Sequence, residues 1–194
     1  MNLSAVILAG GKSERMGQDK ALLTIEGVPL LRRTWAVAHR LTPDVRIVTS
    51  RRDRYQSLLP PDVTWLDEST PGGPLLAFEQ ALRACSSAAT DWLLLLACDL
   101  PNLQVEPLQQ WSQSLAQLSP EAIAHVPKTA QGWEPLCGFY RSTSLPSLQE
   151  YLSTGQRSFQ AWLNAAPVVA ITDVPIGLLA NCNTPEDWHR LTQT

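Results

Sequence analysis

The chain has 194 residues, of which 44 % are hydrophobic and 17 % are charged, a composition that predicts one folded domain with a sizeable core. Its 15 basic and 18 acidic residues give a net charge of −3, which leaves no electrostatic case for a nucleic-acid partner. The longest strongly apolar run, residues 92–98, is far shorter than the roughly 20 residues of a membrane span, so no membrane partner is expected.

The four cysteines are scattered through the chain and include no Cys-x-x-Cys pair, which argues against a zinc site. Residues 1–4 lack the basic region of a signal peptide, and the apolar run that follows them is short. Together these features predict reduced thiols and a cytoplasmic protein.

The first predicted strand, residues 5–9, runs directly into a glycine-rich basic loop. The loop carries three glycines and three cations: Gly10, Gly11, Gly17, Lys12, Arg15 and Lys20. Glycine lets a backbone approach a ligand closely, and backbone N–H groups beside cations suit a polyphosphate. A glycine turn followed by a solvated basic loop is the alternative, but this concentration of glycines and cations favours a nucleoside triphosphate site.

Two common phosphate motifs are excluded by spacing. A P-loop needs a glycine five positions before its Gly-Lys-Ser end, and Val6 occupies that position here. A dinucleotide fingerprint needs Gly-x-Gly-x-x-Gly, which glycines at positions 10, 11 and 17 do not provide.

The rest of the chain alternates strands and helices. Strands are predicted at 46–49, 63–66 and 92–98, with shorter ones near 122–126, 136–140 and 168–171. Helices are predicted over 30–41, from Gly73-Pro74 to 85, over 105–118, around 159–163 and from Thr184 onward. This alternation predicts a single α/β domain over residues 1–194, a three-layer αβα arrangement around a mostly parallel sheet.

The tryptophans divide into two groups. Trp35, Trp111 and Trp162 lie on apolar helical stripes and are expected in the core. Trp133 stands in a polar loop and is a candidate binding residue.

Ligands of an open α/β sheet bind beyond the carboxyl ends of its strands, and three predicted strand ends carry notable residues. The first strand leads to Gly10, the third ends at Asp67, and the strand over 92–98 is followed by Asp99. Beside triphosphate oxygens, one carboxylate is enough to hold Mg²⁺, which keeps substrate oxygens and waters as its other ligands. The alternative is that Asp99 only starts a turn before Pro101.

Asn181 and Asn183 place two amides at a two-residue spacing, which puts both on one side of an extended segment. Both suit substrate binding, or a share in a metal site through the amide oxygen. The alternative is that Asn183 or Thr184 merely caps the last helix.

Catalytic bases are scarce in the chain. None of the three histidines has an evident Ser or Cys nucleophile beside it, which argues against acyl transfer. A phosphate-ended acceptor is already anionic, since its second pKa is about 6, and needs no strong base. Its attack on a nucleotide α-phosphate can rely on positioning and charge neutralisation.

Residues 8–17, followed by Asp19 and Lys20, resemble the signature of nucleotidyltransferases with a sugar-nucleotide-transferase-like fold. Further segments match in order: Asp67 with 73–75, then 98–101, 134–136, 155–158 and 181–186. The ordered set spans residues 6–187 and resembles the molybdenum cofactor guanylyltransferases, the MobA family. Leu-Ala-Gly-Gly at 8–11 is typical of these enzymes, whereas related cytidylyltransferases usually have alanine in place of Gly10. An asparagine that the family often has after its second strand is missing, and Thr49 or Ser50 must serve in its place.

The resemblance implies a nucleotide-diphospho-sugar-transferase-like Rossmann-type fold, with nucleotide-binding residues in the N-terminal half and acceptor-binding residues in the C-terminal half. It implies transfer of GMP from GTP to molybdopterin or the molybdenum cofactor, with Mg²⁺ as the metal and pyrophosphate as the second product. Molybdoenzymes or other cofactor-synthesis proteins would be further partners. The alternatives are a cytidylyltransferase, a sugar-phosphate nucleotidyltransferase, or a nucleotide-binding module without turnover.

The resemblance also implies roles for particular residues. The catalytic residues would be Arg15 on the β- and γ-phosphates, Lys20 on the α-phosphate and Asp99 on the metal. The nucleotide-binding residues would be Leu8, Ala9, Gly10, Gly11, Lys20, Asp67, Gly73 and Asp99, with Asp67 contacting base or ribose. The acceptor-binding residues would be Arg157, Asn181 and Asn183.

Overall fold

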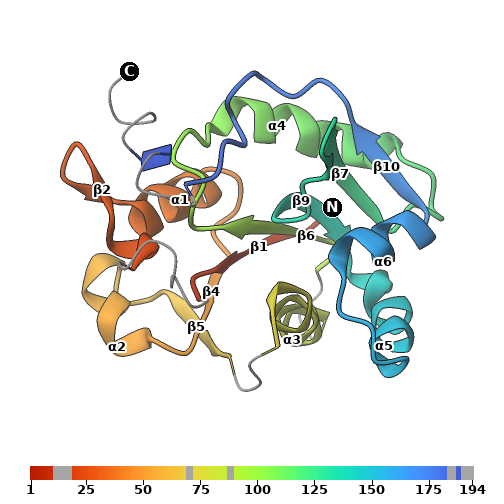
Figure 1. Cartoon of the computed structure of the whole chain (residues 1–194), viewed down its shortest axis with the longest axis horizontal. Helices are drawn as coiled ribbons and strands as arrows, with labels where there is room; N and C mark the ends of the chain where they lie inside the picture. Colours follow the sequence, from red (N-terminus) through yellow and green to blue (C-terminus); the bar gives the residue numbers. More distant parts are fainter. Residues whose placement is uncertain (11–18, 69–71, 87–89, 183–186, 189–194) are drawn as a thin grey trace.

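The computed structural model describes residues 1–10, 19–68, 72–86, 90–182 and 187–188. Within these residues an eight-stranded sheet has the order β10-β7-β9-β6-β1-β4-β5, and β8 pairs with β7 at its side (Figure 1). The strands are β1 (Leu3–Leu8), β4 (Val45–Thr49), β5 (Thr64–Asp67), β6 (Trp92–Ala97), β7 (Ala124–Thr129), β8 (Gly132–Trp133), β9 (Cys137–Arg141) and β10 (Val168–Ile171). A separate hairpin pairs β2 (Thr24–Ile25) with β3 (Val28–Pro29).

The sheet is mostly parallel, as predicted. β6, β1, β4 and β5 pair in parallel, and so do β7 and β10. β9 alone among the strands of the described sheet path runs antiparallel to both of its neighbours, β6 and β7. The carboxyl ends of β1, β4, β5 and β6 therefore meet at one edge, which the start of β9 also reaches.

Helices cover both faces of this sheet (Figure 1). The α-helices are α1 (Leu30–His39), α2 (Arg52–Tyr55), α3 (Pro74–Ser86), α4 (Val105–Ser114), α5 (Leu145–Ser153) and α6 (Phe159–Ala165). Buried residues of α1 and α4 belong to one hydrophobic cluster, and those of α3, α5 and α6 belong to a second. This confirms the predicted three-layer αβα architecture.

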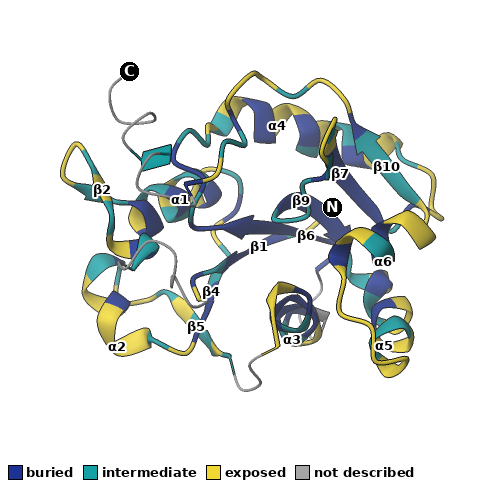
Figure 2. Cartoon of the chain, in the orientation of Figure 1, coloured by how far each residue is buried: buried dark blue, intermediate teal, exposed yellow. Residues whose placement is uncertain are grey.

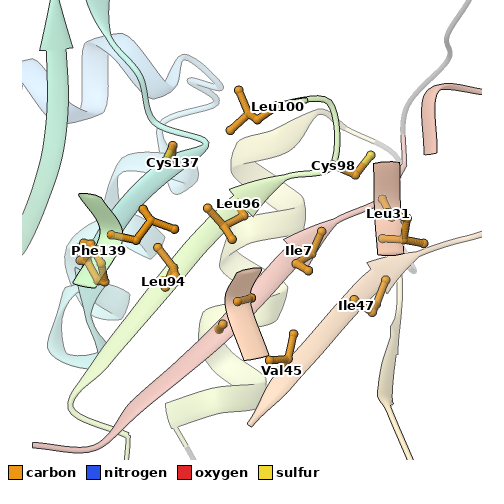
Figure 3. Close-up of a cluster of buried hydrophobic side chains, with 14 of the residues drawn as sticks. Ile7, Leu31, Val45, Ile47, Leu94, Leu96, Cys98, Leu100, Cys137 and Phe139 are labelled. Atoms are coloured by element: carbon orange, nitrogen blue, oxygen red, sulfur yellow. The ribbon is translucent and has the colours of Figure 1, made fainter. Parts of the chain in front are cut away.

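The central strand β6 is buried along its whole length (Figure 2). Because side chains alternate along a strand, Leu94 and Leu96 pack in the first cluster while Leu93 and Leu95 pack in the second. Figure 3 shows Leu94 and Leu96 beside Ile7 of β1 in the first cluster. Burial of a leucine side chain contributes about 1.5–3 kcal/mol, so this strand anchors both layers of the core.

Several elements differ from the sequence expectations. The hairpin β2–β3, the short helix α2, the strand β8 and the helix α5 are present but were not predicted. The predicted last helix, starting at Thr184, begins outside the described residues.

Within the described residues, no helix combines the length and apolarity needed to span a bilayer. Each of the four cysteines is a buried free thiol.

Trp133 is a correction to the sequence analysis. Only 8 % of its surface is exposed, because the hairpin β7–β8 folds its indole into the second hydrophobic cluster. Its Nε1 donates to Asn164 Oδ1 at 2.8 Å, and the Lys128 ammonium lies 4.6 Å from the ring centroid. Trp133 is therefore a core residue rather than a ligand platform, whereas Trp111 and Trp162 are buried as expected.

His125 generates a prediction about stability and pH. Its ring joins three elements, with Nδ1 3.1 Å from the Val169 carbonyl and Nε2 3.1 Å from Ser114 Oγ. Burial lowers the pKa of His125 below its ordinary value. Between about pH 6.5 and the lower folded-state pKa, the unfolded chain takes up a proton that the folded chain does not, so stability falls as the pH falls. We expect the urea midpoint to fall more from pH 7.5 to 5.5 in the wild type than in His125→Gln.

The matched control is His39→Gln, which replaces an exposed histidine of α1 and leaves His125 in place. This variant should keep the pH dependence of the wild type. Equal pH dependence in the wild type and in His125→Gln would contradict the assignment.

Candidate functional site

A pocket of about 680 Å³ opens at the sheet edge where β1, β4, β5 and β6 end. This volume lies within the range typical of small-ligand sites. The pocket is lined by Leu8, Ala9, Gly10, Asp19, Lys20, Ala21, Val48, Ser50, Arg51, Tyr55, Glu68, Gly72, Gly73, Pro74, Ala77, Ala97, Cys98, Asp99 and Leu136. Six of these were predicted as site residues: Leu8, Ala9, Gly10, Lys20, Gly73 and Asp99.

The two predicted catalytic residues that the structure describes form an ion pair. Lys20 Nζ lies 2.9 Å from Asp99 Oδ2, and their side chains are only 17 % and 20 % exposed. Asp99 follows β6, while Lys20 opens the 3₁₀ helix η1 (Lys20–Leu22), so the fold joins residues 79 positions apart. The pair places one cation and one carboxylate side by side in the pocket.

Asp19 holds the turn that carries Lys20. Its carboxylate caps η1 by accepting from the Ala21 N–H at 3.3 Å, and both of its oxygens lie 2.9 Å from the Tyr55 hydroxyl. It also accepts from Arg51 at 3.1 Å and from the more exposed Arg54 at 3.3 Å. Burial, reinforced by Asp19, raises the pKa of Tyr55, which keeps the phenol protonated and donating.

This network was missed at the level of sequence. The pattern Asp19-Lys20 was part of the recognised signature, but no spacing rule links it to Arg51 and Tyr55. The sequence shows charged residues at 51–54, but it does not show that the fold brings them into contact with Asp19. The network shows that the Lys20 turn is held from α2, an element that the sequence analysis did not predict.

The end of β4 shows which residue could take the place of the asparagine that the family often has after its second strand. Thr49 is only 1 % exposed, and its hydroxyl accepts a hydrogen bond from the Arg51 N–H at 3.0 Å. Ser50 and Arg51 line the pocket instead. Of the two residues considered in place of the asparagine, the structure therefore brings Ser50 into the pocket.

The structure places Glu68 in the pocket rather than Asp67. Asp67 pairs in register with Thr49 at the end of β5 and is exposed. Successive side chains of a strand point to opposite faces, so the neighbouring Glu68 lines the pocket while Asp67 does not. The expected Asp67 contact with the nucleoside therefore lacks support from the pocket geometry.

The start of α3 forms another wall of the pocket. Gly73 has φ +90°, a left-handed conformation that favours glycine, and its carbonyl accepts from the Ala77 N–H at 3.2 Å. The N–H groups at a helix start and the helix dipole both favour an anion. This wall therefore suits the phosphate groups of a ligand.

The residues predicted to bind the acceptor and described by the structure, Asn181 and Arg157, do not line the pocket. The Cys182 N–H donates to the Asp99 carbonyl at 3.2 Å, which brings the C-terminal segment beside the ion pair, although Asn181 itself is exposed and does not line the pocket. Arg157 also does not line it, because its guanidinium donates to the carbonyls of Leu152 and Gln156. The remaining predicted residues, Gly11, Arg15 and Asn183, lie outside the described residues.

The other chemistry in the pocket is limited. Burial raises the pKa of Cys98 to about 12, so this thiol stays protonated and is not an activated nucleophile. Among the described residues no group of three or more His, Cys, Asp or Glu side chains could hold a metal ion. A single carboxylate, Asp99, fits an ion that takes most of its ligands from a phosphate substrate and water.

A profile of the MobA-like NTP transferase domain matches residues 5–168. The chain belongs to this family. It is 50 % identical over 186 residues to a probable molybdenum cofactor guanylyltransferase of Nostoc sp., covering 96 % of this chain and 88 % of that protein. It is 47 % identical over 194 residues to the probable molybdenum cofactor guanylyltransferase of Synechococcus elongatus, covering 98 % of each. The predicted family and the predicted enzyme class, a nucleotidyltransferase, are confirmed.

The solved structures support the fold. The molybdopterin-guanine dinucleotide biosynthesis protein A of Archaeoglobus fulgidus superimposes with a TM-score of 0.76 at 20 % identity, covering 98 % of this chain and 97 % of that one. The 4-diphosphocytidyl-2C-methyl-D-erythritol synthase of Anaerococcus prevotii gives 0.75 at 13 % identity, covering 99 % and 95 %. The nucleotide-diphospho-sugar-transferase-like fold is thus confirmed, and it is common to enzymes with different nucleotides.

The Asp19 network predicts a large effect of one hydroxyl. Tyr55→Phe removes a hydrogen bond to a nearly buried carboxylate and should lower the free energy of unfolding by about 2 kcal/mol. Urea unfolding measures the change. The control is Tyr151→Phe, whose hydroxyl donates to the Ser158 carbonyl at an exposed position and should cost about 0.5 kcal/mol or less. Equal losses in the two variants would contradict the role of Asp19.

Proposed function

We propose that this chain transfers GMP from GTP to molybdopterin or the molybdenum cofactor, forming a guanine dinucleotide cofactor and pyrophosphate. The observation that carries the proposal is the Lys20–Asp99 pair in a pocket at the strand ends. The names of relatives that are 47–50 % identical over nearly the whole chain supply the substrates.

The donor nucleotide occupies the pocket between the end of β1 and the start of α3. Gly10 lets the backbone approach the nucleotide, and the N–H groups at the start of α3 suit its phosphates. Arg15 and Gly11 belong to the same proposal as ligands of the triphosphate. Leu8 and Ala9, which also line the pocket, are further residues proposed to bind the nucleotide.

Lys20 neutralises the negative charge that shifts during transfer. Its ammonium is held in the pocket by Asp99 and by the turn that Asp19 caps, so it is already in position when the α-phosphate binds. A preorganised cation stabilises developing charge more effectively than mobile water does.

Asp99 is the residue that would hold Mg²⁺. Its carboxylate is the sole side-chain carboxylate directly after β6, and the burial of that strand keeps it in a defined place. When bound, Mg²⁺ neutralises charge on the phosphate oxygens of donor and acceptor.

The acceptor phosphate attacks the α-phosphorus in line. A bond forms between the acceptor oxygen and that phosphorus, and the bond to the leaving pyrophosphate breaks. No side-chain base is required, since the acceptor phosphate is anionic near neutral pH. Asn181, Asn183 and Arg157 are proposed on the acceptor side. The Cys182–Asp99 hydrogen bond, which brings residue 182 beside the ion pair, supports this proposal for the neighbouring Asn181.

The reaction itself is the first test. Purified enzyme given GTP, Mg²⁺ and molybdopterin should release pyrophosphate and form the dinucleotide, measured by a coupled pyrophosphate assay and by mass spectrometry. Parallel reactions with CTP, and with GTP and a sugar phosphate, serve as controls and should be much slower. Binding of GTP without pyrophosphate release would contradict the proposal, as would a preference for CTP.

Asp99→Asn tests the metal site. The variant should keep its fold but lose at least about a hundredfold in kcat, because a neutral amide binds Mg²⁺ poorly. Calorimetric titration of GTP with and without Mg²⁺ gives a second readout, since the wild type should show a metal-dependent gain in affinity that the variant lacks.

Asp91→Asn is the matched control, because Asp91 immediately precedes the same strand at its opposite end and contacts the chain terminus. It should retain wild-type turnover and the metal effect on GTP binding. A fully active Asp99→Asn enzyme would exclude the proposed metal role.

A further inference from the structure

Glu68 is, among the described residues that line the pocket, the one acidic side chain that the mechanism above does not use. The other two carboxylates that line it are engaged: Asp99 pairs with Lys20, and Asp19 is bound by Arg51 and Tyr55. Among the described residues none makes a hydrogen bond or ion pair with the Glu68 carboxylate. A carboxylate that lines a pocket without such a partner has its acceptor oxygens available for a ligand.

The backbone keeps Glu68 at this position. The Glu68 N–H donates to the Thr49 carbonyl at 3.3 Å, which extends the pairing of β5 with β4 by one residue. This continuation of the ladder turns Glu68 toward the pocket and Asp67 away from it. The strand register therefore fixes the side of β5 from which the Glu68 side chain leaves the backbone.

Glu68 also lies against Gly10. A Cβ atom added at Gly10 would come within 2.7 Å of Glu68 Oε2, closer than side-chain carbons are found in proteins. The absence of a side chain at residue 10 therefore leaves the space that the carboxylate occupies. The glycine that the sequence analysis associated with guanylyl transfer is thus in contact with an acidic group.

We propose that Glu68 reads the guanine base of the donor nucleotide by accepting hydrogen bonds from its N1–H and 2-amino groups. This inference rests on the proposed function and adds the residue that selects the nucleotide. Guanine presents these two donors side by side, which suits the two oxygens of a carboxylate. On the corresponding edge of cytosine the ring nitrogen N3 and the carbonyl oxygen O2 are acceptors that the carboxylate repels, and only the 4-amino group donates, so the paired contact is lost.

Inosine triphosphate isolates the contact, because its base keeps N1–H but lacks the 2-amino group. Calorimetric titration with GTP, ITP and CTP, each with Mg²⁺, should show that the wild type binds GTP about tenfold or more tightly than ITP, since one hydrogen bond to a charged group is lost. In Glu68→Ala the two nucleotides should bind within about twofold of each other. Glu68→Gln should also reduce the preference, because its NH₂ group faces a donor.

Two further variants separate Glu68 from its surroundings. Asp67→Ala should keep the GTP-to-ITP ratio of the wild type, because Asp67 does not line the pocket. Asp62→Ala removes an equal charge from the exposed turn before β5 and should keep the ratio as well. Thermal unfolding of each variant without nucleotide checks that the fold is intact.

The proposal is overturned if Glu68→Ala and Glu68→Gln, both folded, keep the wild-type preference for GTP over ITP, or if Asp67→Ala abolishes it. Failure of the proposed function gives a different pattern. The wild type itself would then release no pyrophosphate with GTP and molybdopterin, or would bind CTP more tightly than GTP.

Discussion

The burial of β6 on both faces is the constraint on which the rest of the molecule depends. All six of its residues are buried, so the strand has to lie inside the sheet, and helices have to cover it on each side. Its neighbours β1 and β9 then occupy fixed registers along it. Asp99, two residues beyond the end of this strand, is thereby held at the sheet edge, where Lys20 pairs with its carboxylate and the Cys182 N–H donates to its carbonyl. The chemistry of the site thus depends on hydrophobic packing some distance away.

The pocket contains charges of both signs, and most are matched. Lys20 neutralises Asp99, and Arg51 with Arg54 neutralises Asp19. Such pairing lowers the cost of keeping carboxylates in a partly buried place before substrate arrives. It also keeps cations beside the phosphate-binding region, where a metal and a triphosphate bring further charges of both signs. These paired charges, beside a Cys98 thiol that stays protonated, are consistent with catalysis by positioning rather than by a nucleophile or base.

Much of this architecture could be predicted from the sequence, because the patterns that indicate strands and helices lie within short runs of consecutive residues. Apolar runs such as 92–98 and apolar stripes such as 105–118 carry their periodicity in consecutive residues, so strands and helices were recognised where burial is strong. The strand-end rule then located Gly10, Asp67 and Asp99 at one edge, and the glycine-rich basic loop supplied Lys20, before the contact of Lys20 with Asp99 was known. Motif resemblance added the family, which the comparisons confirm.

The features that could not be predicted depend on strand register and on contacts between distant segments, which no local sequence pattern encodes. Whether Asp67 or Glu68 faces the pocket is decided by the pairing of β5 with β4, a matter of one residue in register. The ties from Tyr55 to Asp19 join segments 36 residues apart. Trp133 seemed to stand in a polar loop because the short strand β8, which turns it inward, has only two residues.

The reversed strand β9 has a consequence for how the protein can move. β9 pairs with β6 over five residue positions, so the N-terminal and C-terminal halves of the chain share one continuous hydrogen-bonded ladder. A hinge that opened or closed the two halves as rigid bodies would have to break that ladder and expose the core beneath it. Accommodation of two large substrates therefore has to come from side chains and connecting segments along the pocket edge, while the sheet under them stays still.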